Sequence, residues 1–587
     1  MQDNKNITLA AVLSVIILVC WTWFYEKPKA EKRLIEQKLY EETQKAEKQK
    51  NVTQAVQISD SKNPNTTSAS TEIKNNNVEK ITPTTKNRDD ILSETSSKRI
   101  QISSESLHGS ISLEGARFDD LTLAKYFVTS EKKEEVKLFS PSQSKERYFA
   151  DFGWLSSDST IDLPKPNTLW KSNSDKLTPQ NPISLSWTNK DNIEFIIKIS
   201  LDENYMFSVT QTVKNNSNKD ISLATYGRVN RSKGFEKGTY ILHEGAIGVF
   251  NDILQEVTYE DLIEEKNKDF TAENGGWLGI TDKYWLSSLI PDKNISYKAN
   301  FNSSYQNKTQ FFNVEFIGQE FAVNKNSELS FENHMFAGAK KIKLLDQYSK
   351  DFDIKLFDRA VDFGWFYFLT KPFLFIIDFL YKFLGNFGLA ILAMTVLIKL
   401  ALFPMANKSY TAIAKVKKLQ PKIDEIKKKF KEDRVAFNRE MMELYKKEKV
   451  NPAAGCLPIL IQIPIFFSLY KVLYVTLDMR QAPFYGWIQD LSAPDPTSIF
   501  NLFGLLPFET STMFTIGIWP ILMGITMIIQ QKLSPVTSDP TQAKIMKFMP
   551  YVLTFVLAAF PAGLVIYWTW SNVLSILQQW FINRRLK

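Results

Sequence analysis

Residues Leu389–Pro404 read LAILAMTVLIKLALFP, an apolar run whose only charged side chain is Lys399. An ammonium group is costly in hydrocarbon, so a lysine in such a run either reaches the headgroups or faces a wet cavity. Pro404 follows Lys399 at about 7.5 Å along a helix, which permits the first arrangement. Thr395 lies one helical turn earlier on the same face, which favours a polar groove. Both interpretations stay open from these residues alone.

This run is one of five bilayer-crossing candidates in the last third of the chain. They are Leu384–Pro404, Gly455–Thr476, Met513–Gln531, Phe548–Phe560 and Ala562–Ile582. A crossing helix needs about 20 apolar residues, so the short fourth run predicts local thinning of the bilayer. Residues 354–383 mix aromatic side chains with charges and predict an amphipathic helix lying in the interface. We therefore expect residues 354–587 to form a five-helix membrane core, and the whole chain to be a multi-pass α-helical membrane protein.

Polar side chains occur inside two further candidate crossings. Gln462 lies between Pro458 and Pro464, and Ser571 and Asn572 lie in the last run. A proline leaves a backbone carbonyl without its partner, and such a group in lipid needs another donor. Gln462 is therefore either a local donor for its own helix or part of a groove shared with Lys399.

The loops between the runs predict the orientation. Residues 405–450 hold fourteen Lys/Arg against seven Asp/Glu, whereas residues 477–512 hold one against four. The positive-inside rule places the first loop in the cytosol and the second outside. Counting crossings then puts both termini in the cytoplasm.

The basic loop at 405–453 predicts a cytosolic helical hairpin. Its expected apolar seam is Ile413, Val416, Leu419, Ile423, Ile426 and Phe430, continued by Val435, Met442 and Tyr445 beyond a charged turn at Lys431–Asp433. Pro421 is expected to start a fresh helix. The hairpin is either a solvated basic surface or a binding site for a polyanion such as ribosomal RNA or anionic lipid.

The N-terminal part predicts an anchor and a tether. Ile7–Tyr25 is uncharged and apolar and ends in aromatic residues, which favours an uncleaved anchor at 1–25 over a cleaved signal peptide. Residues 26–98 are rich in Lys, Glu, Asn and Ser, and predict a flexible linker.

Residues 99–353 predict a large exported β sandwich. Alternating runs such as Ile193–Leu201, Tyr205–Val213 and Tyr284–Ile290 are separated by turn signals. The three histidines, His108, His243 and His334, have no ligand spacing, and the two cysteines lie far apart. A sugar-processing site is conceivable in a sandwich of this size, but no motif supports one. No metal site, catalytic site or cofactor is predicted.

Four stretches then carry a family resemblance. They are VNPAAGCLPILIQIPIFFSLY (Val450–Tyr470), RQAPFYGWIQDLSAPDP (Arg480–Pro496), KLSPVTSDPTQAKIMKFMP (Lys532–Pro550) and FPAGLVIYWTWSN (Phe560–Asn572). In this order they resemble the YidC/Oxa/Alb insertase family along nearly all of 356–585. An N-terminal anchor with a large exported domain is similar to the Gram-negative members.

The resemblance implies a β-supersandwich in the periplasm of an inner-membrane protein, and a groove open to cytosol and lipid. Lys399 matches the family's groove arginine, keeping its charge without the bidentate fork, and Thr395 matches a groove threonine. Substrate-contact positions map onto Ile463, Phe466 and Trp568, with Tyr567 beside them. The implied function is insertion, folding and assembly of membrane proteins.

The implied partners are nascent membrane proteins, membrane lipids and the Sec translocon, with the ribosome as a candidate for the basic hairpin and C-terminus. A transporter would show paired intramembrane charges or inverted repeats, and neither is visible. An intramembrane enzyme would need a histidine or an acid pair in the crossings, and none stands out. No nucleotide is implied, because no phosphate-binding glycine loop is present.

Overall fold

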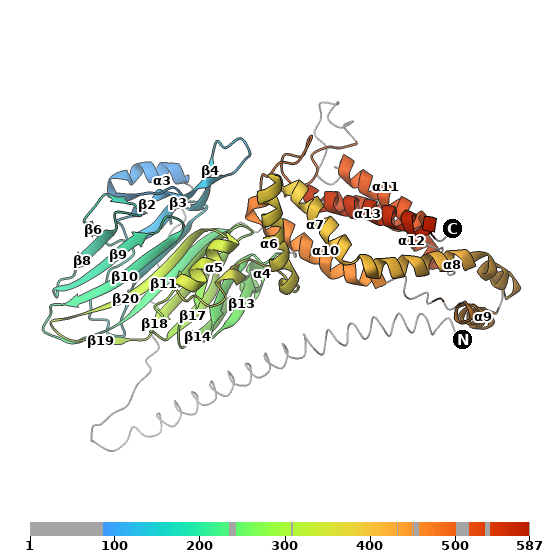
Figure 1. The fold of residues 1–587 in the computed structure, drawn as a ribbon. Coiled ribbons are helices and arrows are strands. Elements are labelled where there is room, and N and C mark those ends of the chain that lie inside the picture. Colours follow the sequence, from blue (N-terminus) through green and yellow to red (C-terminus); the bar gives the residue numbers. More distant parts are fainter. Residues whose placement is uncertain are drawn as a thin grey trace, which may run out of the picture.

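The computed structural model describes residues 86–233, 242–306, 309–430, 433–448, 450, 457–499, 516–533 and 540–585. Within these ranges the chain forms a β half and a helical half that lie against each other (Figure 1). The predicted anchor at 1–25 and the predicted linker up to residue 85 lie outside the described residues. So do the first residues of the predicted crossings at Gly455 and Met513.

The first sheet has eleven strands, and its pairs are antiparallel except β1 with β7. Its order is β14 (Asn267–Ala272), β17 (Tyr297–Gln306), β18 (Thr309–Gly318), β11 (Ile221–Lys233), β5 (Tyr148–Leu155), β3 (Arg117–Phe127), β2 (Leu107–Ser112), β1 (Arg99–Ser103) and β7 (Lys176–Leu177), with β19 (Phe321–Val323) on β11 and β4 (Glu135–Phe139) on β3.

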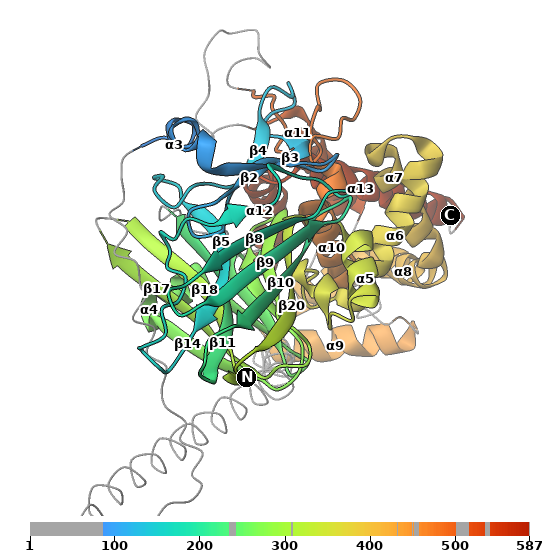
Figure 2. The same ribbon diagram turned by 90° about the vertical axis from the view of Figure 1, so that its left-hand side faces the viewer.

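The second sheet has nine strands. Its order is β13 (Ile253–Thr258), β12 (Gly245–Phe250), β15 (Trp277–Thr281), β16 (Trp285–Ile290), β20 (Ser327–Ala339), β10 (Met206–Asn215), β9 (Ile193–Leu201), β8 (Ile183–Thr188) and β6 (Lys171–Ser172). Strands β8, β9, β10 and β20 run side by side in Figure 2. The alternation that predicted β9 is confirmed, because its buried residues recur at every second position.

The two sheets pack face to face around one apolar core. Phe118 of β3 meets Phe207 of β10 edge to face, with ring centroids 5.4 Å apart. The buried amide of Gln211 in β10 donates a 2.7 Å hydrogen bond to the carbonyl of Gly153 in β5. The predicted large β sandwich is therefore present.

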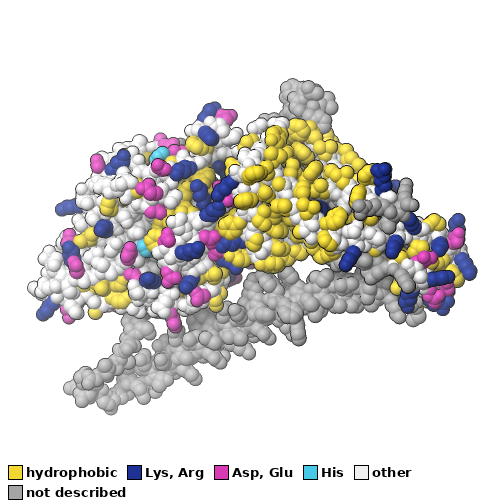
Figure 3. Space-filling view, viewed as in Figure 1, with side chains coloured by type: hydrophobic (Ala, Val, Ile, Leu, Met, Phe, Trp, Pro, Cys, Tyr) yellow, Lys and Arg dark blue, Asp and Glu magenta, His cyan; other side chains and the backbone are white. Residues whose placement is uncertain are grey.

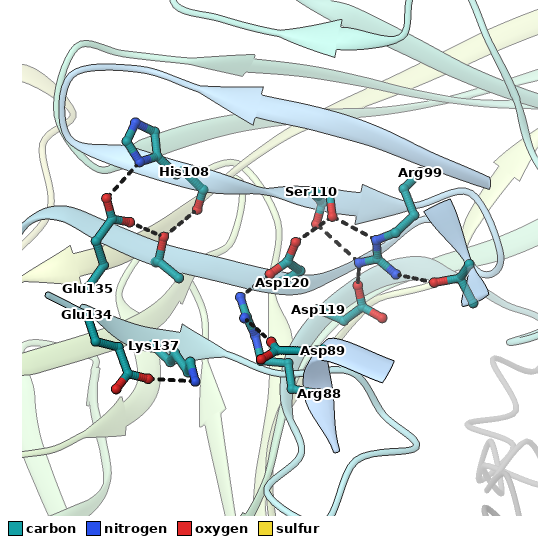
Figure 4. A network of polar contacts seen from close by, with 12 residues as sticks. Arg88, Asp89, Arg99, His108, Ser110, Asp119, Asp120, Glu134, Glu135 and Lys137 are labelled. Atoms are coloured by element: carbon teal, nitrogen blue, oxygen red, sulfur yellow. Dashed lines mark hydrogen bonds and ion pairs between the residues drawn. The ribbon is translucent and has the colours of Figure 1, made fainter. Parts of the chain in front are cut away.

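A polar network ties the start of the described chain to the first sheet (Figure 4). Helix α3 (Arg88–Glu94) lies in the stretch that the sequence assigned to the linker, and Arg88 pairs with Asp120 of β3. Arg99 pairs with Asp119 and donates to Ser110 at 2.7 Å, and Ser110 donates to Asp120 at 2.5 Å. Burial raises the pKa of Asp119, while Arg99 opposes that rise. The pair of Arg88 and Asp120 holds the start of α3 against the sandwich.

The remaining elements are helical. They are η2 (Ser96–Lys98), α4 (Tyr259–Glu265), α5 (Ile342–Asp351), η3 (Phe357–Ala360), α6 (Tyr367–Leu384), α7 (Phe387–Ala401), α8 (Phe403–Lys429), α9 (Arg434–Lys447), α10 (Leu457–Val475), η5 (Leu477–Met479), α11 (Ile518–Leu533), α12 (Pro540–Leu557) and α13 (Ala562–Arg585).

The described helices differ from the predicted crossings. Taken singly, none of them combines the length and the apolarity that a bilayer crossing requires; α7 and α8 meet the requirement only as a pair, bent by 69° where they join. Helix α12 begins at Pro540, before the predicted run at Phe548, because backbone hydrogen bonds continue into a polar segment. The interfacial helix predicted over 354–383 begins only at Tyr367, after Gly364 adopts a left-handed conformation with φ of 69°.

The basic segment forms two packed helices, α8 and α9. Val416, Leu419 and Ile423 of α8 are buried against Tyr445, as predicted. The predicted α9 seam is wrong at Val435 and Met442, which are exposed, and Phe437, Met441 and Leu444 pack there instead. The side chain of Asp433 caps α9 and thereby fixes its first turn.

Two further expectations about this segment are corrected. Pro421 lies inside α8 and does not start a helix, since apolar packing on both sides of it holds the helix together. Ile413 packs toward Ile582 of α13, away from α9.

Apolar packing and polar contacts join the two halves. The indole of Trp277 in β15 donates to the carbonyl of Lys355 at 3.0 Å and stacks edge to face on Phe357. Lys471 of α10 pairs with Asp362 at 2.7 Å. The guanidinium of Arg480 donates to the carbonyl of Phe127, at the end of β3, at 2.6 Å. The sandwich is therefore held to the helices at several points.

Candidate functional site

Helix α13 presents a polar stripe toward the centre of the helical half. Ser571 and Ser575 are one turn apart and 1% and 2% exposed. The hydroxyl of Ser575 donates to the carbonyl of Ser571 at 2.9 Å, and an i to i−4 bond of this kind satisfies a buried hydroxyl within its own helix. The acceptor lone pairs of both hydroxyls stay available to neighbouring helices.

Lys399 of α7 reaches this stripe. Its side chain is half-buried, and its ammonium donates a 2.8 Å hydrogen bond to the hydroxyl of Ser575. In the part of the chain that the structure describes, no carboxylate forms a salt bridge with Lys399. The ammonium is therefore directed at the hydroxyl of Ser575 on α13, with no carboxylate partner among the described residues.

Gln462 of α10 meets the same stripe from another side. Its amide donates to the hydroxyl of Ser571 at 3.2 Å. The side chain thus bonds to a neighbouring helix instead of repairing the helix around Pro464. Lys399 of α7, Ser575 and Ser571 of α13, and Gln462 of α10 are thus joined by successive hydrogen bonds into one polar line.

The other two predicted polar residues point elsewhere. Thr395 is 1% exposed, and its hydroxyl donates to the carbonyl of Ile391 in its own helix at 2.7 Å. Asn572 follows Ser571 by one position, about 100° around the helix, and its amide donates to Thr526 of α11 at 3.1 Å. Asn572 therefore joins α13 to α11 and is not bonded to Lys399.

The four predicted contact residues differ in accessibility. Ile463 of α10 is 44% exposed. Phe466 and Trp568 are half-buried and pack edge to face with ring centroids 4.7 Å apart. Tyr567 is 3% exposed and belongs to the core. In this arrangement Ile463 presents its side chain outward and Tyr567 does not.

Sequence reasoning did not single out Ser575 and Thr526. Ser575 had a usable signal, because it follows Ser571 by four residues and so lies on the same helical face. Thr526 had none, because its pairing with Asn572 depends on how α11 crosses α13.

The histidines lie in the β half and make ordinary contacts. His108 bonds Glu135 at 3.0 Å, and His334 bonds Ser208 at 3.0 Å. Burial lowers the pKa of His243 and of His334 from the usual 6.5, which favours the neutral form of both. Among the described residues no group of three or more His, Cys, Asp or Glu is placed to hold a metal ion.

Comparison with known proteins identifies the family. The family model described as "60Kd inner membrane protein" matches residues 379–587, and that described as "YidC periplasmic domain" matches residues 99–376. The "Membrane protein insertase YidC" of Rickettsia bellii (strain OSU 85-389) is 49% identical over 588 residues, covering 100% of both chains. That of Rickettsia felis (strain ATCC VR-1525 / URRWXCal2) is 53% identical over 496 residues, covering 84% of this chain and 89% of its own.

A crystal structure of an active YidC insertase is also similar. It shares 18% identity, with a TM-score of 0.34, over 82% of this chain and 92% of its own. The two family models and the full-length relatives show that the chain belongs to the YidC family of membrane protein insertases.

Proposed function

We propose that this chain inserts membrane proteins into the inner membrane by receiving their polar segments at the line formed by Lys399, Ser575, Ser571 and Gln462. The observation that carries the proposal is the ammonium of Lys399, bonded to a neutral hydroxyl and without a carboxylate partner among the described residues. A positive charge held without a counterion attracts an acidic group that enters its surroundings.

Membrane placement of the helical half is supported by its outer surface. Apolar side chains gather over the helices in Figure 3, whereas charged side chains dot the β half. A contiguous apolar surface of this extent is typical of lipid contact. The exposed large apolar side chains include Phe368, Phe379 and Phe383 of α6, Leu397 and Leu400 of α7, Phe467 of α10, Ile525 and Ile529 of α11, Val552 and Phe555 of α12, and Leu577 and Phe581 of α13.

We infer a five-helix core formed by α7, α10, α11, α12 and α13, with α6 in the outer interface. The β half then lies in the periplasm, and both termini and the hairpin of α8 and α9 lie in the cytoplasm. The excess of lysine and arginine in residues 405–450 supports this orientation.

The mechanism follows from the polar line. The hydrophilic tail of a nascent membrane protein enters between α7, α10 and α13, where Lys399 attracts its acidic groups. Hydroxyl and amide groups on α13 and α10 replace part of the water that the tail loses, which lowers the cost of burying it. The hydrophobic segment then leaves sideways into lipid, past exposed Ile463 of α10.

The basic hairpin supports a role for a polyanionic partner. Lysines gather along α8 and α9 while an apolar seam holds the two helices together, so the charge sits on a folded surface. We propose the ribosome as that partner, and the Sec translocon as a second partner in the membrane.

Reconstitution tests the function. The purified full-length chain in liposomes should raise the insertion of a two-helix substrate, measured by protease protection, above that of protein-free liposomes. The same liposomes should not gain permeability to a small dye. Dye flux without insertion would instead indicate a transporter and overturn the proposal.

A further inference from the structure

A cavity of about 350 Å³ lies where the two halves meet. Its walls come from α5 and the turn before it, from α6, from the first residue of α7 and from η5. In Figure 1, α6 lies between the sandwich and the remaining helices. The cavity is therefore at the level where the apolar surface of the helical half gives way to the charged surface of the β half (Figure 3).

One wall of the cavity is apolar and continuous with the surface that we assign to lipid. Leu374 and Ile377 of α6 line the cavity and are 7% and 1% exposed. Phe375 and Phe379, on the other side of the same helix, are exposed. An acyl chain that follows α6 toward the cavity therefore stays against apolar side chains.

Charges of opposite sign occupy the rim. Lys343 and Asp378 pair with each other. The side chains of Lys341 and Asp478 also line the cavity. Within the described part of the chain neither side chain forms a hydrogen bond or a salt bridge, although their opposite charges attract each other across the rim. The ammonium of Lys341 lies over the ring of Tyr126, 5.7 Å from its centroid. One cation and one anion are thus available to a ligand.

The cation side of the rim has additional donors. The first turn of α5 follows Lys341 and lines the same wall, and no side chain caps it. Uncapped N–H groups beside a lysine suit a phosphate oxygen. On the opposite side, the carboxylate of Asp478 suits a primary ammonium, which donates charge-assisted hydrogen bonds.

We propose that this cavity binds the headgroup of phosphatidylethanolamine, with its phosphate at Lys341 and its ammonium at Asp478. The inference rests on the proposed membrane placement of the helical half. Phosphatidylglycerol has the phosphate without the cation, and phosphatidylcholine has a quaternary ammonium that donates no N–H bond to a carboxylate. Both therefore satisfy only one end of the site.

Lipid binding to the full-length chain in detergent tests the proposal without any insertion substrate. Native mass spectrometry would compare dioleoyl phosphatidylethanolamine, phosphatidylcholine and phosphatidylglycerol, with glycerophosphoethanolamine as the headgroup alone. The variants are Asp478→Asn and Lys341→Gln. Lys350→Gln on α5 and Asp191→Asn before β9 are the controls, because both residues are exposed and outside the cavity.

The wild-type chain should prefer phosphatidylethanolamine over the other two lipids by about tenfold, the value of one charge-assisted hydrogen bond. Asp478→Asn should abolish this preference, Lys341→Gln should weaken all three lipids, and the controls should behave as the wild type. Equal binding of the three lipids, or an unchanged preference in Asp478→Asn, overturns the proposal. Equal binding of the headgroup alone also overturns it, since the ligand is then not a lipid. Because this measurement uses no substrate, its failure is separate from failure of the insertase proposal.

Discussion

The ammonium of Lys399 in α7 and the hydroxyl of Ser575 in α13 are hydrogen-bonded at 2.8 Å, although 176 positions separate them in the chain. A neutral acceptor orients the ammonium without cancelling its charge, whereas a carboxylate would have done both. This difference makes Lys399 available to an incoming acidic group.

Replacing Lys399 with alanine should lower the insertion of substrates with acidic tails about tenfold, equivalent to ~1.4 kcal/mol, and affect neutral tails less. Lys399→Arg should keep most of the activity because the charge remains. Ser575→Ala removes the hydroxyl that orients the ammonium but leaves the charge, so it should lower insertion of acidic tails less than Lys399→Ala does. The measurement is protease protection in liposomes with paired substrates; a loss of the same size for both tails would exclude the charge-based step.

The pair of Lys471 and Asp362 should make stability depend on acid pH. Burial disfavours the charged carboxylate, but Lys471 and the N–H groups of His243 and Gly364 more than offset this, so the pKa of Asp362 is below 3.8. A lowered folded pKa means that the contribution is complete above the unfolded value and is lost as pH falls through the folded one.

Asp362→Asn should therefore cost about 1–3 kcal/mol at pH 7 and reduce the loss of stability below about pH 4. Thermal unfolding of the full-length chain in detergent, followed by circular dichroism from pH 3 to pH 7, measures both effects. Asp191→Asn serves as control. Parallel pH curves for wild type and Asp362→Asn would show that this pair is not the source of the dependence.

Lys340 should produce a second pH dependence of stability, at alkaline pH and of the same sign. Burial lowers its pKa to about 8 from 10.5, although its ammonium donates to Thr281 at 2.9 Å and to the carbonyl of Ala360 at 3.2 Å. Between these two values the unfolded chain binds more protons than the folded one, so stability rises with pH.

The rise between about pH 8 and pH 10.5 should be about 3 kcal/mol and should be absent in Lys340→Met. Chemical denaturation at a series of pH values measures it as the difference between the two proteins, which removes the contribution of the other lysines. If the variant keeps the same slope, the buried ammonium of Lys340 is not responsible.

Gly388 near the start of α7 leaves room for the loop after α10. A Cβ atom at this position would lie 1.9 Å from Cδ2 of Phe484, closer than two carbons can approach. Gly388→Ala should thus destabilise the chain by about 1–3 kcal/mol. The double variant with Phe484→Ala should recover part of this loss, as measured by thermal unfolding. Additive costs of the two changes would contradict the contact.

Local pattern predicted much of the fold. The alternation over Ile193–Leu201 located β9 with its observed bounds. Successive side chains of a strand point to opposite faces, so a half-buried strand alternates apolar and polar residues in the sequence. The apolar spacing of Val416, Leu419 and Ile423 located the buried face of α8 for the same kind of reason. Lys399, Gln462 and Ser571 of the candidate site were also visible in the sequence, since each interrupts an apolar run, whereas Ser575 was not singled out.

Other features depended on packing between distant segments. The face of α9 that is turned toward α8 depends on the capped first turn of α9 and on its packing against α8. For this reason the expected seam at Val435 and Met442 was wrong. Pro421 stays inside α8 because contacts on both sides hold the helix.

The sequence by itself determined that a lysine, two serines and a glutamine lie within apolar segments, because composition and period are local properties. Only the tertiary structure decided that Lys399 and Gln462 meet at Ser575 and Ser571, that Thr395 bonds within its own helix, and that Asn572 turns to α11. A hydrogen bond of about 3 Å between two helices forms only when the helices cross at the right position and angle. That crossing geometry is determined by side-chain packing along the whole length of both helices.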